Sequence, residues 1–448
     1  MLIKWLINFC PPMHNIPPDI KNYIKKRTSL KWKLFPQLNK KYEIIVVVPV
    51  LAEYENLKVL VESLELCDKV NTSCLVIFVV NNVENASIAV KENNDASYKY
   101  LLEKITQQNE NFLDFAVVDA YSRNLALDVK NGGVGLARKL GMDLALGCFD
   151  YNTSLRKALV CLDADCTVSS NYFDRIKTQF INNNFDAAYL NYNHPLPEDE
   201  EKLKAIICYE IFLRFYLLGL SFAGSRFAIQ TIGSTMICSP EAYVKVGGMN
   251  KRKAAEDFYF MEALAKNYDV HMIKDAFVYP SSRGSWRVPF GTGQRVNRFL
   301  EKKQNEYLLY SIKSFKILKE WNTIYLNKGS YSPEELMRKA ELIDKHLFDF
   351  LSANNFLEDW RKIFKNSKHQ DQIDRQKTFW FDGFRTLKLI HYLKDTAYPQ
   401  QQMFDAVDEL LKLFNFASIP SRESNNIPGI ETQKRYLSIL RNLTNSLT

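Results

Sequence analysis

The stretch A-L-V-C-L-D-A-D, residues 158–165, decides the fold of this chain. Its first five residues form a short apolar run, which is typical of a strand buried inside a parallel sheet. Because side chains alternate between the two faces of a strand, we expect Asp163 and Asp165 to point the same way where the strand leaves the sheet. Two neighbouring carboxylates repel each other unless a cation lies between them, and Mg²⁺ or Mn²⁺ is the hard cation that such oxygens bind. Because such a metal completes its shell with substrate phosphates, the stretch indicates phosphate-ester chemistry.

Strand and helix patterns alternate on both sides of this stretch. Strands are expected over 43–51, 74–80, 112–118, 158–162, 187–192 and 229–238, and helices over 53–66, over 135–146 and from residue 240. This alternation predicts an α/β fold with a doubly wound, mostly parallel sheet.

After about residue 300 the strand patterns stop. Apolar residues recur at helical spacing over 301–326, 333–351, 371–394 and 400–414. We therefore divide the chain into an N-terminal arm (1–41), an α/β domain (42–300) and an all-helical C-terminal domain (301–448).

The charge of the chain is concentrated in the arm. The net charge is +8, with 59 basic and 51 acidic residues, and residues 1–41 hold nine of the basic residues and one acid, so 42–448 carry 50 of each sign. The sequence leaves two interpretations open: a solvated, proline-containing arm packed on the domain, or a peripheral contact with an anionic membrane surface. Nucleic acid is not an expected partner, because the basic excess ends where the folded domain begins.

Two further features bear on the compartment. The eight cysteines show no C-x-x-C pair and several lie inside apolar runs, which favours a reduced, cytoplasmic protein, with the arm as a candidate contact with the inner face of the cytoplasmic membrane. The one membrane-like stretch, residues 205–224, contains Glu210 and Arg214 four residues apart. Charged side chains are costly in a bilayer and could pair on one helical face, so we expect a buried helix.

Four segments occur in order within the α/β region. They are V-P-V-L-A-E-Y-E-N-L (48–57), N-G-G-V-G-L-A-R-K-L-G (131–141), L-D-A-D-C (162–166), and G-G-M (247–249) followed by A-E-D-F-Y-F (255–260). Together they resemble the family 2 glycosyltransferases with the GT-A fold, over roughly residues 42–300. Each segment alone is weak evidence, and four in the right order are a strong match.

The resemblance implies an inverting, metal-assisted transfer of a sugar from a nucleoside-diphosphate sugar to an acceptor hydroxyl, in glycan or glycolipid assembly of the cell envelope. The acceptor would be a glycan, a lipid-linked molecule or a small molecule. By this resemblance, Asp257 would be the catalytic base, Glu256 would orient it or the acceptor, and Asp165 with Asp163 would hold Mn²⁺ or Mg²⁺. The donor-binding residues would be Pro49, Glu53, Asn81, Gly135, Arg138 and Asp163.

Several positions depart from the family pattern. Ala52 stands where an asparagine is usual, Asn81 and Asn82 where an aspartate usually contacts the base, and Lys139 where an asparagine follows the arginine. The acceptor motif of processive members has only a loose counterpart at residues 295–299, and without flanking transmembrane helices we do not expect a processive synthase. Arg283 is a further candidate contact for phosphate.

Two other classes remain open. A nucleotidyltransferase acting on a sugar phosphate would share the sheet and the metal carboxylates, but it should carry a glycine- and Arg/Lys-rich loop where this chain has L-A-E-Y (51–54). A catalytically silent GT-A-like scaffold is disfavoured by the presence of all three aspartates. The G-V-G turn at 133–135 lacks the third glycine of a dinucleotide fingerprint and does not follow the first strand.

Overall fold

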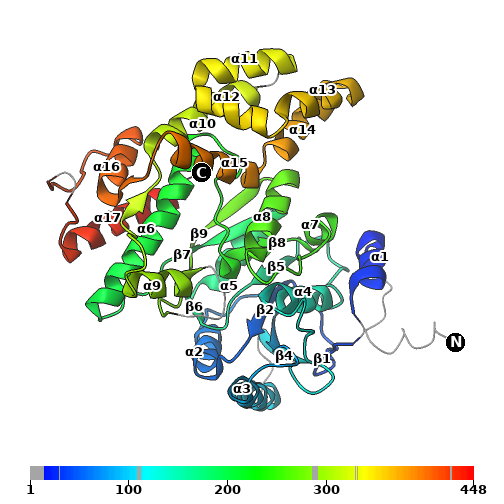
Figure 1. The fold of residues 1–448 in the computed structure, drawn as a ribbon. Helices are drawn as coiled ribbons and strands as arrows, with labels where there is room; N and C mark the ends of the chain where they lie inside the picture. Colours follow the sequence, from blue (N-terminus) through cyan, green and yellow to red (C-terminus); the bar gives the residue numbers. More distant parts are fainter. Residues whose placement is uncertain are drawn as a thin grey trace. The chain divides into compact units, whose positions relative to one another are not determined.

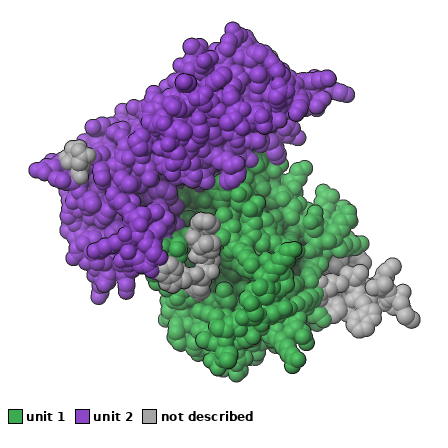
Figure 2. All heavy atoms as spheres, in the orientation of Figure 1, with its two compact units in different colours: residues 1–195, 230–294 green, residues 196–229, 295–448 purple. Residues whose placement is uncertain are grey.

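The computed structural model describes residues 15–447, except 30, 108–111, 285–290, 328, 330 and 424–425. The chain forms two compact units, coloured separately in Figure 2. Unit 1 comprises Met1–Pro195 and Gln230–Gln294, and unit 2 comprises Leu196–Ile229 and Arg295–Thr448.

Unit 1 is built on a nine-stranded sheet of order β1-β4-β3-β2-β5-β8-β7-β9-β6 (Figure 1). Its strands are β1 (Leu34–Phe35), β2 (Ile44–Val50), β3 (Cys74–Asn81), β4 (Leu113–Ala120), β5 (Ala158–Cys161), β6 (Cys166–Val168), β7 (Ala187–Tyr192), β8 (Met236–Cys238) and β9 (Val270–Pro280). The ladders β4-β3-β2-β5 and β7-β9 are parallel, whereas the antiparallel pairs are short. The predicted α/β class with a mostly parallel sheet is therefore confirmed.

Helices cover both faces of this sheet. Val46 and Val48 of β2 share one apolar core with Leu57 of α2 (Tyr54–Glu65), while a Cβ on Gly141 of α4 (Val134–Ala145) would lie 2.3 Å from Val47 Cγ1. Because residues two apart on a strand share a face, α2 and α4 lie on opposite sides of β2. The remaining helices of unit 1 are α1 (Pro18–Arg27), α3 (Ile88–Thr106), α5 (Tyr172–Arg175), a π-helical turn (Ile176–Ile181), a 3₁₀ turn (Gly233–Thr235), α7 (Pro240–Lys245) and α8 (Glu256–Asn267).

The strand order reverses between β2 and β5. From β2 the chain adds β3 and then β4 on one side, and β5 joins β2 on its other side. In open α/β sheets the crevice for a ligand forms at such a switch point, outside the carboxyl ends of the strands. The loops that leave β2 and β5 therefore mark the expected site.

The described part of the N-terminal arm is packed on the domain, which is one of the two interpretations that the sequence left open. Residues 15–41 form part of unit 1, because α1 buries Ile20 and Tyr23 and Leu34 of β1 pairs with Val118 of β4. Pro18 stands at the first helical position, where the missing N–H of proline costs no hydrogen bond. Prolines in the arm thus begin a helix, and the rest of the arm, residues 1–14, lies outside the described residues.

Unit 2 is helical, with one short antiparallel pair of strands, β10 (Leu308–Leu309) and β11 (Gln401–Gln402), among its described residues. Its helices are α6 (Glu200–Phe222), α9 (Thr292–Leu300, which starts at the boundary), α10 (Ile312–Tyr325), α11 (Pro333–Ile343), α12 (Lys345–Ala353), α13 (Phe356–Asn366), α14 (Gln370–Trp380), α15 (Gly383–Thr396), α16 (Met403–Leu413) and α17 (Ile430–Asn445). The helices predicted over 333–351 and 371–394 are each two helices, because Asp344 and Asp382 cap a new helix inside each range.

Unit 2 resumes at Arg295, near the predicted boundary at residue 300, but it also includes α6, which the prediction placed within the α/β domain. Among the described helices, α6 is one that is long and apolar enough to cross a membrane, and 67% of its apolar window is buried inside the protein. Glu210 and Arg214 pair as predicted, at 2.8 Å, and Arg441 of α17 adds bonds of 2.7 and 2.8 Å to the same carboxylate. Since Glu210 and Arg214 are fully buried, this triad fixes α17 on α6.

We predict that Glu210→Ala destabilises the full-length protein by about 3–5 kcal/mol, because it leaves the buried Arg214 charge without its carboxylate. Urea unfolding followed by circular dichroism measures the change, with Glu341→Ala, at an exposed helical position, as the matched control. Equal unfolding curves for the two variants would contradict the structural role of the triad.

Candidate active site

Five carboxylates and two arginines gather around the carboxyl ends of β2 and β5. They come from the loop after β2, the turn after β5, α4, the start of α8 and the segment after β9. The residues are Glu53, Asp163, Asp165, Glu256 and Asp257, with Arg138 and Arg283.

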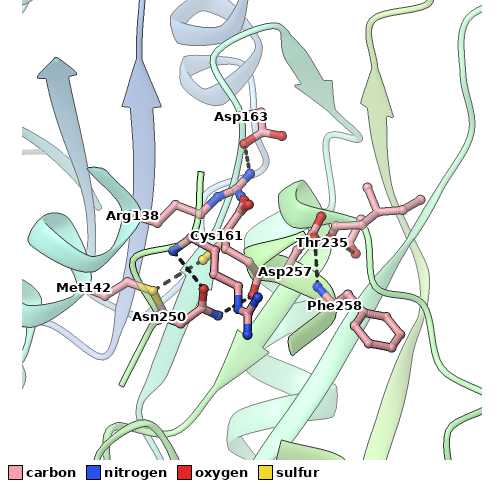
Figure 3. A network of polar contacts seen from close by, with 11 residues as sticks. Arg138, Met142, Cys161, Asp163, Thr235, Asn250, Asp257 and Phe258 are labelled. Atoms are coloured by element: carbon pink, nitrogen blue, oxygen red, sulfur yellow. Dashed lines mark hydrogen bonds and ion pairs between the residues drawn. The ribbon is translucent and has the colours of Figure 1, made fainter. Parts of the chain in front are cut away.

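Arg138 of α4 joins two elements. Its guanidinium donates through Nη2 to Asp163 Oδ1 in the turn after β5 (Figure 3). It also donates through Nη1 to Glu256 Oε1 at the start of α8. Arg138 and Glu256 are buried, whereas 33% of the Asp163 side chain is exposed. The arginine therefore places one positive charge between two acids and reduces their mutual repulsion.

Gly233 makes room for this arginine. A Cβ at Gly233 would lie 2.3 Å from Arg138 Nη2, so any larger residue displaces the guanidinium. The strand predicted over 229–238 is wrong for its first part, which forms a loop and a 3₁₀ turn before β8. We did not predict this role of Gly233 from the sequence, although a glycine inside a strand pattern indicates close approach by another group.

Arg283, after β9, binds two further acids of the site, Glu53 and Asp165. Its Nη2 donates to Glu53 Oε1 and Oε2 at 2.5 and 2.6 Å and to Asp165 Oδ2 at 3.2 Å. Glu53 is buried, and 27% of the Asp165 side chain is exposed. The segment after β9 is thus connected to both loops of the switch point.

Asp163 and Asp165 lie beyond the end of β5, so the predicted alternation along a strand is wrong for them. The strand β5 ends at Cys161, and the residues that follow form a turn in which Cys166 N donates to Asp163 O at 3.1 Å. Alternation along a strand therefore does not apply to these two aspartates. The structure brings both of them into the site, each bound to its own arginine.

Asp257 has an unusual ionisation. Burial of its carboxyl, reinforced by the negative charge of Glu256, raises the pKa of Asp257 from 3.8 to about 7, against the opposing effect of Arg138. Phe258 N donates to Asp257 Oδ1 at 2.7 Å (Figure 3). A carboxyl with a pKa near neutrality can take up and release a proton at physiological pH.

The loop after β2 contains Ala52, at the position where family 2 glycosyltransferases usually have asparagine. Ala52 has φ of +52°, in the left-handed region that asparagine tolerates better than alanine. The side chains of Asn93 and Asn94 in α3 support this loop, since Asn94 Oδ1 accepts from Ala52 N at 2.8 Å and Asn93 Oδ1 from Tyr54 N at 3.0 Å. The strained loop therefore presents Glu53 to Arg283.

Three predicted donor-binding residues take structural positions beside the site. Asn81 is buried, and its Nδ2 donates to Val50 O and Val79 O, both at 3.0 Å, which ties β3 to β2. Pro49 is partly buried within β2. A Cβ at Gly135 would lie 2.4 Å from Arg252 O, so this glycine lets the loop before α8 pack on α4. Their donor-binding roles stay predictions.

The described residues hold no cluster of three or more His, Cys, Asp or Glu side chains arranged for a metal ion. Mg²⁺ needs only one or two carboxylates when substrate phosphates complete its shell, and the partly exposed Asp163 and Asp165 fit that requirement. A cavity of about 630 Å³ lies at the opposite, amino edge of the sheet, lined by residues such as Glu43, Ser73 and Lys177, and is remote from this chemistry.

Comparison with known proteins leaves the identity of the chain open. No protein-family model and no curated protein matches it. Among solved structures it is similar to S. aureus TarS 1-349 in complex with UDP-GlcNAc, at 14% identity over 90% of this chain and 91% of that chain, with a TM-score of 0.35. It is also similar to the mannosyltransferase PcManGT from Pyrobaculum calidifontis in complex with GDP-Man and Mn²⁺, at 11% identity over 95% and 92%, with a TM-score of 0.33. Values this low carry no inference about activity, which has to come from the site.

We predict that Asp257→Asn stabilises the protein increasingly as the pH rises from 5 to 8. A carboxyl whose folded pKa lies near 7 stabilises the fold while it is protonated and loses that contribution as the pH rises through 7. The residue as a whole is only partly buried, and solvent screening limits the gain to about 1–2 kcal/mol at pH 8. Urea unfolding at the two pH values measures it, with the exposed Asp68→Asn as control. A gain that is the same at both pH values would refute the raised pKa.

Proposed function

We propose that this chain is an inverting glycosyltransferase of the family 2, GT-A type, which moves a sugar from a nucleoside-diphosphate sugar to an acceptor hydroxyl with the assistance of Mn²⁺ or Mg²⁺. The observation that carries the proposal is the position of Asp257, next to Glu256 and in one charge network with Arg138 and Asp163, where burial raises its pKa. A base tuned to neutral pH beside partly exposed acids suits proton removal from an alcohol next to a phosphate leaving group.

The charge of the site supports the need for a cation. Five carboxylates and two arginines sum to −3 when all are ionised, and to −2 when Asp257 is protonated, counted over the described residues. A diphosphate adds further negative charge, so this site binds it well only with a cation. Asp165 and Asp163 would hold that ion, whose chemistry is to neutralise the charge that develops on the departing nucleoside diphosphate.

The protein's own residues supply the other steps. Asp257 removes the proton of the acceptor hydroxyl as its oxygen bonds to the anomeric carbon from the face opposite the leaving group. The bond between that carbon and the phosphate oxygen breaks, and its electron pair leaves with the nucleoside diphosphate. Glu256 is an orienting residue. Its carboxylate binds Arg138 and fixes the guanidinium, which in turn holds Asp163 in place.

A nucleotidyltransferase or a catalytically silent scaffold would require other properties of the same residues. A nucleotidyltransferase needs cationic side chains in the loop after its first strand, whereas here the buried Glu53 occupies that loop and binds Arg283. A silent scaffold has no use for a base with a pKa near 7. The acceptor class, whether glycan, lipid-linked or small molecule, and a role in cell-envelope glycan assembly are part of the proposal.

Asp165→Asn is expected to abolish hydrolysis and transfer of sugar nucleotides in the presence of Mn²⁺, because the site loses a charged ligand for the cation. Release of nucleoside diphosphate from a panel of uridine and guanosine diphosphate sugars measures this, with and without EDTA. Asp68→Asn should keep wild-type rates. Normal turnover of Asp165→Asn, or of the wild type in EDTA, would remove the metal from the proposal, and release of pyrophosphate would favour a nucleotidyltransferase.

Asp257→Asn should bind the donor almost normally but lower kcat by about 10²- to 10⁴-fold, the usual contribution of a general base. The wild-type rate should rise with pH up to about 7 and then level off, because the base works in its deprotonated form. The residual rate of the variant should lack this step. Loss of donor binding together with catalysis would instead place Asp257 in the donor pocket.

A further inference from the structure

We propose that α1 is a docking helix for an anionic lipid surface, fixed to unit 1 by a buried anchor and carrying its basic side chains outward. The inference does not depend on the proposed activity, because it is carried by the anchor of α1, the exposure of its charges and the sequence next to it.

The anchor is a network around the Tyr23 hydroxyl. This hydroxyl accepts from Lys139 Nζ at 2.7 Å and donates to Asp143 Oδ1 at 3.1 Å, and Tyr243 donates to the same carboxylate at 2.6 Å. Gly248, with φ of +78°, makes the contact possible, since a Cβ there would lie 1.9 Å from the Tyr23 hydroxyl. Lys139, at the position where family 2 glycosyltransferases usually have asparagine, binds the Tyr23 hydroxyl in this network.

The anchor fixes which face of α1 points outward. Ile20 and Tyr23 face unit 1, and Lys25, Lys26 and Arg27 in the last turn are exposed. Because the helix is held by buried contacts, these three cations are presented from a defined position.

Some cations of other surface helices in unit 1 are neutralised by an acid on the same helix. Lys58 pairs with Glu55 three residues away, and Lys99 pairs with Asp95 four residues away. Within the part of the chain that the structure describes, the three cations in the last turn of α1 form no ion pair. The one acid of the helix, Asp19, stands in its first turn. The outward charge of α1 is therefore available to an external anion.

The neighbouring sequence selects lipid over nucleic acid as the anionic partner. Residues 1–10, M-L-I-K-W-L-I-N-F-C, include eight hydrophobic residues, among them Trp5 and Phe9. Stable attachment of a protein to a membrane surface takes two signals, and an apolar segment beside a basic patch provides both. RNA offers the negative charge without an apolar phase. The anionic cytoplasmic leaflet offers both.

The test is sedimentation of the full-length protein with vesicles of phosphatidylcholine, with or without phosphatidylglycerol. The wild type should bind the anionic vesicles and lose binding as salt is raised. The triple variant Lys25→Gln, Lys26→Gln, Arg27→Gln should bind them roughly 10- to 100-fold more weakly. The matched control, Lys362→Gln, Lys365→Gln, Lys368→Gln, removes three exposed positive charges in unit 2 and should bind like the wild type.

Three results would overturn the proposal. One is equal binding of anionic vesicles by the triple variant and the wild type. The second is wild-type binding that does not distinguish the two kinds of vesicle. The third is tighter binding of single-stranded RNA than of vesicles, lost in the same triple variant, which would make nucleic acid the partner.

Discussion

The buried guanidinium of Arg138 is the interaction on which the site depends. It places a positive charge between Asp163, in the turn after β5, and Glu256, at the start of α8. Removing one partner from a buried charge pair leaves the others uncompensated, at a cost of several kcal/mol. The glycines around it follow from this constraint, because Gly233 admits the guanidinium and Gly135 admits the loop that carries Glu256. The helix α4, the β5 turn and α8 are thus held together as one frame around the candidate site.

The same frame sets the ionisation of Asp257. Its carboxyl lies next to Glu256, whose charge raises its pKa, while Arg138 opposes the rise. The balance leaves a carboxyl near neutrality at the helix start, although the helix dipole there would favour the charged form. Burial is the largest cause, so the pKa of Asp257 depends on where α8 begins as well as on the neighbouring charges.

Much of the fold could be predicted from the sequence, because parallel strands are continuous apolar runs. The limits of β3 and β7, and the helices α2 and α4, lie within two residues of their predictions. Features that depend on distant partners could not be found in this way. The seating of α1, the assignment of α6 to unit 2 and the division of two long helices all follow from tertiary contacts or from single capping residues.

In the candidate site too, local sequence patterns identified some residues, whereas contacts between distant residues were not predicted. Asp163, Asp165, Glu256 and Arg138 were identified from three of the four local patterns, and the structure brings them together. Gly233 was missed, and the binding of Glu53 by Arg283 was not foreseen, because those two residues are 230 positions apart. The alternation argument for the aspartate pair failed because β5 ends two residues before it.

The central claim is that this cluster of five acids and two arginines binds a nucleoside diphosphate only together with a divalent cation. Isothermal titration calorimetry of the full-length protein with UDP and with GDP, in Mn²⁺ and in EDTA, tests it directly. The account predicts saturable binding of at least one of the two nucleotides in Mn²⁺ and none in EDTA. Binding of equal affinity in EDTA, or no binding of either nucleotide in Mn²⁺, would contradict it.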